Sequence, residues 1–247
     1  KNSKVLISGA GIAGLTCAIW LGRHGFRPVV IEKSPTMRAD GYIISLSHAS
    51  YRYARRLELL EKIAAQNAGI KESSYYDRHG RMMLTLDYRD LFAGIEIVQI
   101  MRDDLEQILY ETVQEFAEIR LATSIRKIAH DGDRTQVIFD DESADEFDVV
   151  IGADGLHSNT RNLSFSEAEV TKRYLGFFSS AYRLPNVLGL NERFENHMEQ
   201  TRYMCVYTTR DSDLACVFIW QSDALAVPPA ETRFNELQTQ FDGAPEV

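Results

Sequence analysis

The amino-terminal pattern is an apolar run, a glycine turn, an amphipathic stretch and a second apolar run. Residues 4–8 and 28–32 are short and almost wholly apolar, which predicts buried strands. Between them, apolar residues recur at helical spacing over 12–23, where we expect a helix. A strand, helix and second strand within about 30 residues form a βαβ crossover, which implies a parallel sheet.

The next stretch predicts a mixture of helices and antiparallel strands. The expected elements up to residue 101 are a strand at 43–46, a helix from 47 to the glycine at 69, a hairpin over 75–86 and a strand at 95–101. A helix follows, capped by Asp103 with Glu106 three residues on. We then expect a meander of strands at 124–129, 135–139 and 147–151. Six acidic residues lie within 140–148, and we interpret them as a solvated turn rather than a cation site.

Beyond residue 161 the chain becomes rich in aromatic strands. We expect strands at 172–182, 202–208 and 214–221, followed by a helix at 232–241. The aromatic side chains of these strands either wall a planar substrate or fill the core of the sheet, and the pattern leaves both readings open.

Composition narrows the functional classes. The 247 residues are 45% hydrophobic and 26% charged with a net charge of −9, which excludes disordered, collagenous and disulfide-rich small proteins. The acidic excess disfavours nucleic acid and anionic membrane surfaces as partners. Cys17, Cys205 and Cys216 form no CxxC pair, so we expect free thiols and a cytoplasmic protein. The uncharged run 5–22 contains four glycines, so we expect no membrane span.

The glycine turn carries a dinucleotide-binding pattern. Gly9, Gly11 and Gly14 match GxGxxG: the first permits a tight turn, the second lets a pyrophosphate approach the backbone, and the third lets helix and strand pack closely. Glu32 follows at the end of the second strand, where a carboxylate accepts hydrogen bonds from ribose hydroxyls. The competing reading is a purely structural glycine turn, and the pattern alone does not separate FAD from NAD.

A second pattern lies in the middle of the chain. Asp154, Gly155, Ser158 and Arg161 form DGxxSxxR directly after an apolar strand. By itself this is an Asp-Gly turn that caps a helix. Together with the GxGxxG and with Arg102 at the start of a helix, it resembles the FAD-dependent aromatic hydroxylases, the flavoprotein monooxygenases of the p-hydroxybenzoate hydroxylase type.

The resemblance implies roles for individual residues. The FAD pyrophosphate would lie on the glycine turn, the adenosine near the second strand, and the phosphates or ribityl chain near two arginines and the Asp-Gly turn. The residues so implicated are Gly9, Gly11, Ile12, Ala13, Gly14, Glu32, Lys33, Arg38, Arg102, Asp154 and Gly155. Arg38 and Arg102 would otherwise be read as solvent-exposed, and no general base or other catalytic residue is identified.

The resemblance also implies a domain organisation. We expect an α/β fold with a Rossmann-like, glutathione-reductase-type FAD-binding domain at 1–171, substrate-domain strands interleaved around 72–100, and a β-rich substrate domain at 172–247. The family pattern continues with a Gly-Asp motif and C-terminal helices, which the sequence lacks. We therefore interpret the chain as a fragment with an incomplete C-terminal part, or as a relative without its flavin-ring site.

The implied activity is hydroxylation of a small planar molecule. The family uses FAD, NAD(P)H and O₂ to oxygenate an aromatic or polycyclic substrate. Residues 38–48 look similar to the tetracycline-inactivating branch, which suggests oxidative inactivation of tetracycline and antibiotic resistance. The alternatives are a reductase or halogenase of the same fold and a noncatalytic nucleotide-binding fragment. Six scattered histidines show no zinc-site spacing, so we expect no metal.

Overall fold

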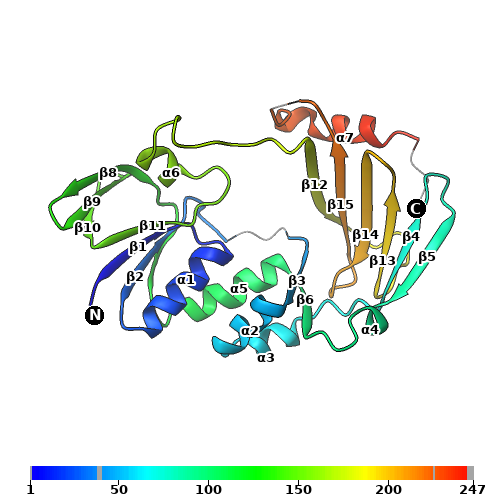
Figure 1. Cartoon of the computed structure of the whole chain (residues 1–247), viewed down its shortest axis with the longest axis horizontal. Coiled ribbons are helices and arrows are strands. Elements are labelled where there is room, and N and C mark those ends of the chain that lie inside the picture. The colour runs from blue at the N-terminus through cyan, green and yellow to red at the C-terminus, as the bar shows by residue number, and fades with distance from the viewer. Residues whose placement is uncertain (1, 38–40, 225, 244–247) are drawn as a thin grey trace. The chain divides into compact units, whose positions relative to one another are not determined.

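The computed structural model describes residues 2–37, 41–224 and 226–243 (Figure 1). The chain divides into two compact units, each built from two separate stretches. Unit 1 comprises Lys1–Ala39 and Asp103–Lys172, and unit 2 comprises Asp40–Arg102 and Arg173–Val247.

Unit 1 is organised around a four-stranded parallel sheet. Its order is β11 (Val149–Gly152), β1 (Lys4–Ser8), β2 (Arg27–Ile31) and β7 (Glu118–Arg120). Helix α1 (Ile12–Arg23) connects β1 to β2, which confirms the predicted crossover. Helix α5 (Arg102–Val113) begins at the boundary of unit 2, and it buries Leu105, Leu109 and Val113 as its periodicity predicts.

A three-stranded antiparallel meander packs on this sheet. It contains β8 (Ile125–Asp131), β9 (Arg134–Phe139) and β10 (Ala144–Phe147), and α6 (Asn159–Ser164) follows β11. The shared core is made of apolar side chains from both sheets: Leu6, Val29, Ile31, Ile125, Val137, Phe139 and Phe147.

The third strand predicted for the meander, 147–151, is wrong as a single element. The chain turns at Asp148, so β10 belongs to the meander and β11 pairs in parallel with β1. The Asp148 carboxylate accepts a hydrogen bond from the Lys4 backbone N–H at 2.6 Å, which anchors the change of sheet.

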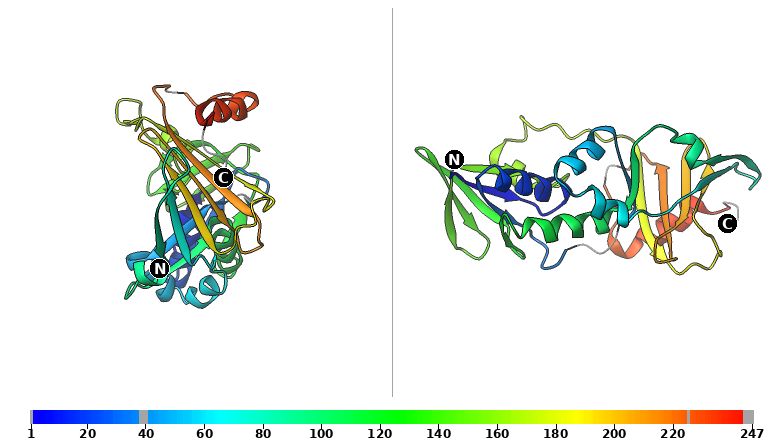
Figure 2. Two further views of the ribbon diagram at one scale, coloured as in Figure 1. Left: turned by 90° about the vertical axis from the view of Figure 1, so that its right-hand side faces the viewer. Right: turned by 90° about the horizontal axis from the view of Figure 1, so that it is seen from below.

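Unit 2 contains a six-stranded sheet (Figure 2). Its order is β12 (Phe177–Leu184), β15 (Leu214–Gln221), β14 (Arg202–Thr208), β13 (Arg193–Met198), β4 (Glu72–Tyr76) and β5 (Met82–Asp87). Only the β13–β4 pair is parallel among these neighbours. Following the short 3₁₀ turn at Ala230–Thr232, α7 (Arg233–Phe241) covers one face, where Leu237 joins a cluster with Phe218 and Trp220.

The opposite face of the sheet packs against a two-stranded antiparallel ribbon, β3 (Ile43–Ser47) with β6 (Ile97–Met101). Tyr207 lies in that interface, only 2% exposed, and its hydroxyl accepts a hydrogen bond from the Ile43 N–H at 2.8 Å. Tyr207 is therefore a core residue. Of the two roles considered for the aromatic side chains, lining a substrate site or filling the core, it has the second.

The single helix expected over 47–69 is also wrong. The structure has α2 (His48–Arg56) and α3 (Leu60–Ala65), and a short α4 (Tyr88–Leu91) follows β5. Between α2 and α3, Glu58 adopts a left-handed φ of 56°, which breaks the helix and lets Leu57 and Leu59 both point into the core. The expected strand at 172–182 likewise begins later, at Phe177.

The chain is thus a mixed α/β protein with parallel and antiparallel sheets. Among the described residues, no helix has the length and apolar character needed to cross a bilayer.

Candidate functional site

Two of the three motif glycines are required by packing inside unit 1. A Cβ on Gly9 would lie 2.5 Å from the Ala153 carbonyl oxygen, and its φ of 111° is strained for any other residue. A Cβ on Gly14 would lie 1.9 Å from the Gly9 carbonyl oxygen. Both glycines therefore have a structural reason that needs no ligand.

Gly11 is different. The nearest heavy atom to its Cβ position is Glu106 Oε1 at 3.9 Å, an ordinary contact distance, so the surrounding protein leaves room for a side chain there. A glycine at this position leaves the backbone bare, as a closely approaching phosphate requires. Packing within the protein therefore requires glycine at positions 9 and 14, whereas it does not require glycine at position 11.

Helix α1 begins at this bare backbone. Gly11 is its N-cap, without a side-chain cap, and the first helical hydrogen bond runs from the Leu15 N–H to the Gly11 carbonyl at 3.0 Å. The N–H groups of Ile12, Ala13 and Gly14 precede that bond and have no carbonyl within the helix to accept them. With no acidic residue in the first turn, the helix presents free donors and the positive end of its dipole.

Glu32 lies immediately after β2 and is tied to the glycine turn. Its Oε2 accepts a hydrogen bond from the Ala10 N–H at 3.0 Å, and its Oε1 accepts one from the Ser34 N–H at 3.0 Å. Each carboxylate oxygen accepts more than one hydrogen bond, so both retain capacity for a hydroxyl donor. The neighbouring Lys33 is exposed, and Arg38 lies outside the described residues.

The Asp154 motif forms a compact cap on α6. The Asp154 carboxylate accepts hydrogen bonds from Ser158 Oγ at 2.5 Å and from the Thr160 N–H at 2.8 Å, and Ser158 Oγ in turn accepts the Arg161 N–H at 3.0 Å. Burial alone raises the pKa of Asp154, but these hydrogen bonds outweigh it and hold the pKa below its ordinary value. The side chain is therefore ionised at neutral pH.

The structure brings this cap to the glycine turn. The Ala153 N–H donates to the Ser8 carbonyl at 2.8 Å, and the Asp154 Cα is 2.9 Å from the position of a Cβ on Gly9. Gly155, with a φ of 78°, has open space on its side-chain position. Of the sequence-predicted residues, those of the glycine turn, Glu32, Asp154 and Gly155 thus converge within unit 1.

Arg102 and Glu106 lie on α5 in different settings. Arg102 is the first residue of α5; its backbone N–H donates to the Tyr42 carbonyl at 3.0 Å, and it is assigned to unit 2. Glu106 is only 3% exposed and lies beside Gly11, a position that sequence reasoning missed because it gave Glu106 only a capping role, three residues after Asp103. Its place on the apolar face of α5, between Leu105 and Leu109, is the signal that indicates burial.

The acidic stretch 140–148 is neutralised largely by the protein's own cations. Asp145 accepts hydrogen bonds from Lys4 Nζ at 2.5 Å and from Arg120 at 3.1 Å. Within the part of the chain that the structure describes, no group of three or more histidine, cysteine or acidic side chains is arranged to hold a metal ion.

Comparison with known protein families shows which family the chain belongs to. The profile of the FAD binding domain family matches residues 2–234, nearly the whole chain. The chain belongs to the FAD binding domain family. This membership, together with monooxygenase relatives, confirms the family expected from the motifs.

Proteins from other organisms resemble this chain along most of its length. An uncharacterized protein of Mycobacterium tuberculosis is 32% identical over 244 residues, covering 96% of this chain and 65% of the relative. A flavin-dependent monooxygenase of Legionella longbeachae is 33% identical over 192 residues, covering 77% of this chain and 49% of the relative. The chain therefore spans between about half and two thirds of the length of these relatives.

The fold of this FAD binding domain protein also matches solved structures. The crystal structure of tetracycline destructase Tet(55) superposes with a TM-score of 0.87 at 25% identity, covering 98% of this chain and 63% of the destructase chain.

Proposed function

We propose that the chain is the FAD-binding and substrate-sheet portion of an FAD- and NAD(P)H-dependent monooxygenase that hydroxylates a planar aromatic or polycyclic molecule. The observation that carries the proposal is the bare backbone at Gly11, next to the free N–H groups of α1 and beside Glu32. The strand order β11-β1-β2-β7 with α1 as crossover supports a Rossmann-like domain of the glutathione reductase type.

The residues present fit FAD. The α1 N–H groups suit the pyrophosphate, since they are donors with no helical partner and lie at the positive end of the dipole. The free acceptor capacity of Glu32 suits the two adenosine ribose hydroxyls. In this proposal the FAD-binding residues are those implied by the resemblance: Gly9, Gly11, Ile12, Ala13, Gly14, Glu32, Lys33, Arg38, Arg102, Asp154 and Gly155.

The chain's own contribution to catalysis is binding and orientation. When bound and reduced by NAD(P)H, FAD supplies the chemistry that activates O₂ for insertion of one oxygen atom into the substrate. Asp154, held ionised by Ser158 and Thr160, would accept hydrogen bonds from the ribityl chain and so fix the cofactor's depth in the site. We assign no residue to proton transfer.

The substrate proposal is tetracycline or a similar multi-ring compound. It is supported by the structural similarity to tetracycline destructase Tet(55), and by the stretch 38–48 that resembles the tetracycline-inactivating branch. The domain division expected from the sequence belongs to the same proposal: an FAD domain at 1–171 with strands interleaved around 72–100, and a substrate domain at 172–247. A cytoplasmic location is supported by the three free cysteines.

The test is spectroscopic and chemical. The purified chain, incubated with FAD and desalted, should retain a yellow flavin absorbance. In air, tetracycline should stimulate NADPH oxidation and gain the mass of one oxygen atom. A chain that retains flavin but forms no oxygenated product is a reductase-like or halogenase-like relative or an incomplete enzyme. A chain that retains no flavin contradicts the proposal and leaves the noncatalytic alternative.

A further inference from the structure

The exposed face of α2 carries a stripe of positive charge. Arg55 and Arg56 lie three and four residues after Arg52, so the three arginines lie along one side of the helix. The opposite side is buried through Ala54 and Leu57. We call this side the α2 cationic stripe; it consists of Arg52, Arg55 and Arg56.

The stripe is poorly neutralised. Helix α2 contains no carboxylate, although exposed helices usually mix both signs and the whole chain carries a net charge of −9. Glu96 reaches Arg55 at 3.4 Å, in a pair whose two side chains are more than half exposed. Within the described residues, Arg52 and Arg56 form no ion pair, and Arg56 lies over the exposed Tyr53 ring at 5.9 Å. Glu58 and Glu61 follow on the turn and on α3.

Helix-dipole stabilisation accounts for only part of the stripe. Cations in a last turn interact favourably with the negative end of a helix, which explains Arg55 and Arg56. Arg52 lies a turn earlier, beyond the reach of that effect. Helix stability therefore does not explain why position 52 is basic.

We propose that the α2 cationic stripe binds the phosphates of the reductant, and in particular the 2′-phosphate that distinguishes NADPH from NADH. This inference rests on the proposed NAD(P)H dependence and deepens it. A phosphate monoester carries about −1.5 to −2 charges at neutral pH, and arginine forks match its oxygens geometrically. Nine helical residues span about 13–14 Å along the axis, long enough for one dinucleotide to meet the stripe with more than one phosphate.

The test is direct binding, measured by calorimetry on the full chain. The probes are adenosine 2′,5′-bisphosphate, which carries the NADPH-specific phosphate, and 5′-ADP, which does not. The variant Arg52→Gln/Arg55→Gln/Arg56→Gln should bind the bisphosphate about tenfold or more weakly than the wild type and lose the preference over 5′-ADP. FAD retention should stay unchanged.

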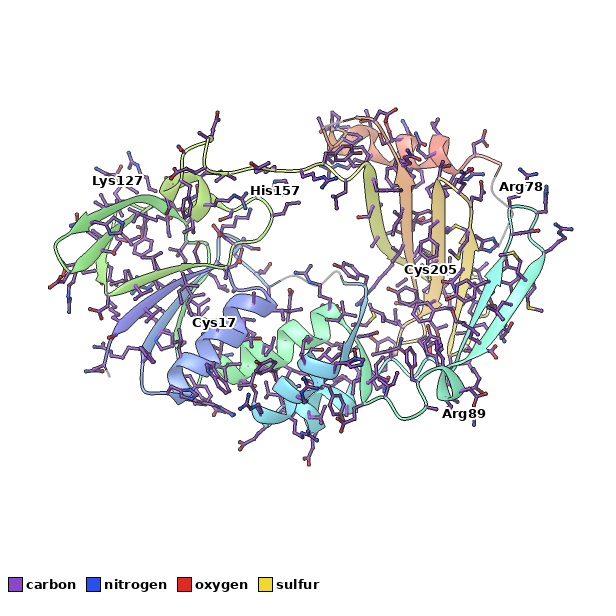
Figure 3. All side chains as sticks on the ribbon, in the orientation of Figure 1. Cys17, Arg78, Arg89, Lys127, His157 and Cys205 are labelled. Atoms are coloured by element: carbon purple, nitrogen blue, oxygen red, sulfur yellow. The ribbon has the colours of Figure 1, made fainter. Side chains whose placement is uncertain are left out.

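A matched control removes three exposed arginines elsewhere in unit 2. Arg78→Gln/Arg81→Gln/Arg89→Gln alters the β4–β5 turn and α4 (Figure 3, which labels Arg78 and Arg89) and lowers the net charge by the same amount. This control should bind the bisphosphate as the wild type does. Equal weakening in both triple variants would show a nonspecific charge effect and overturn the proposal, as would a wild-type chain that does not prefer the bisphosphate.

Kinetics provide a second readout and separate this proposal from the proposed function. In the stripe variant, the KM for NADPH should rise about tenfold, and the KM for NADH should rise less, because NADH lacks the 2′-phosphate and shares only the pyrophosphate. Unchanged NADPH kinetics would overturn the stripe assignment while leaving the monooxygenase proposal intact. Conversely, a chain that binds the bisphosphate through α2 but retains no flavin would contradict the proposed function and not the stripe.

Discussion

The Gly9 carbonyl oxygen lies 1.9 Å from the position that a β-carbon would occupy on residue 14. The atom in the way is backbone, so no side-chain rotation relieves the clash. We expect Gly14→Ala to separate α1 from the turn and to destabilise the protein by about 3 kcal/mol or more, the upper range for overpacking. Thermal unfolding without FAD measures this; an unchanged midpoint would contradict the close packing described.

Gly11→Ala is the matched substitution with the opposite expectation. Its nearest neighbour would be Glu106 Oε1 at 3.9 Å, so the new methyl fits without displacing protein atoms. We expect a thermal midpoint within a few degrees of the wild type, together with an FAD dissociation constant at least tenfold higher, because the methyl occupies the approach to the backbone N–H groups. Equilibrium titration of flavin fluorescence measures the loss. Unaltered affinity would mean that the pyrophosphate does not lie at Gly11.

The hydrogen bonds to Asp154 predict an acid-sensitive contribution to stability. Because its folded-state pKa is below the ordinary value of 3.8, the carboxylate stabilises the fold above that pH and loses its contribution as the pH falls through the folded-state pKa. Asp154→Asn should therefore cost about 1–2 kcal/mol at pH 7, and its difference from the wild type should shrink below about pH 3.8. Urea unfolding across this pH range checks the trend, with the exposed Asp133→Asn as control. A difference that is constant with pH would contradict the role of ionisation.

Asn196 joins three strands in unit 2 and should be costly to remove. Its Nδ2 donates to Ser73 Oγ at 2.8 Å and to the Ser74 carbonyl at 3.0 Å, and its Oδ1 accepts the Tyr203 hydroxyl at 2.7 Å. We expect Asn196→Ala to destabilise the fold by about 2–4 kcal/mol, because buried polar partners lose their hydrogen bonds.

Tyr203→Phe, which removes one donor only, should cost about 1–3 kcal/mol. The exposed Asn191→Ala should leave the midpoint of chemical denaturation unchanged. If Asn196→Ala behaved like this control, the buried network would carry no stability.

Elements with a single, strong periodicity were predictable from the sequence. The β1–α1–β2 unit, β14 and β15 agree closely with their expected bounds, because each buries one regular pattern of apolar residues. Strand β13 was not anticipated, since it buries the polar residues Glu195 and Asn196, and the partners of Asn196 come from β4 and β14. No local pattern reveals such partners.

The candidate site was predictable in outline and not in detail. The spacing of Gly9, Gly11 and Gly14 identified the turn, but it could not show that, of these three, only Gly11 has room for a β-carbon. The burial of Glu106 and the hydrogen bond from the Ala10 N–H to Glu32 likewise arise from tertiary packing.

The parallel pairing of β1 with β11 has a consequence for synthesis on the ribosome. Lys4 at the start of β1 and Asp148 just before β11 are 144 residues apart in the chain. At about 5–20 residues per second, the apolar edge of β1 emerges on the order of ten seconds before its partner exists. During that interval the edge of β1 that later pairs with β11 has no partner, and an unpaired strand edge favours aggregation. The yield of folded protein should therefore depend on holdase chaperones and on translation speed between β2 and β11.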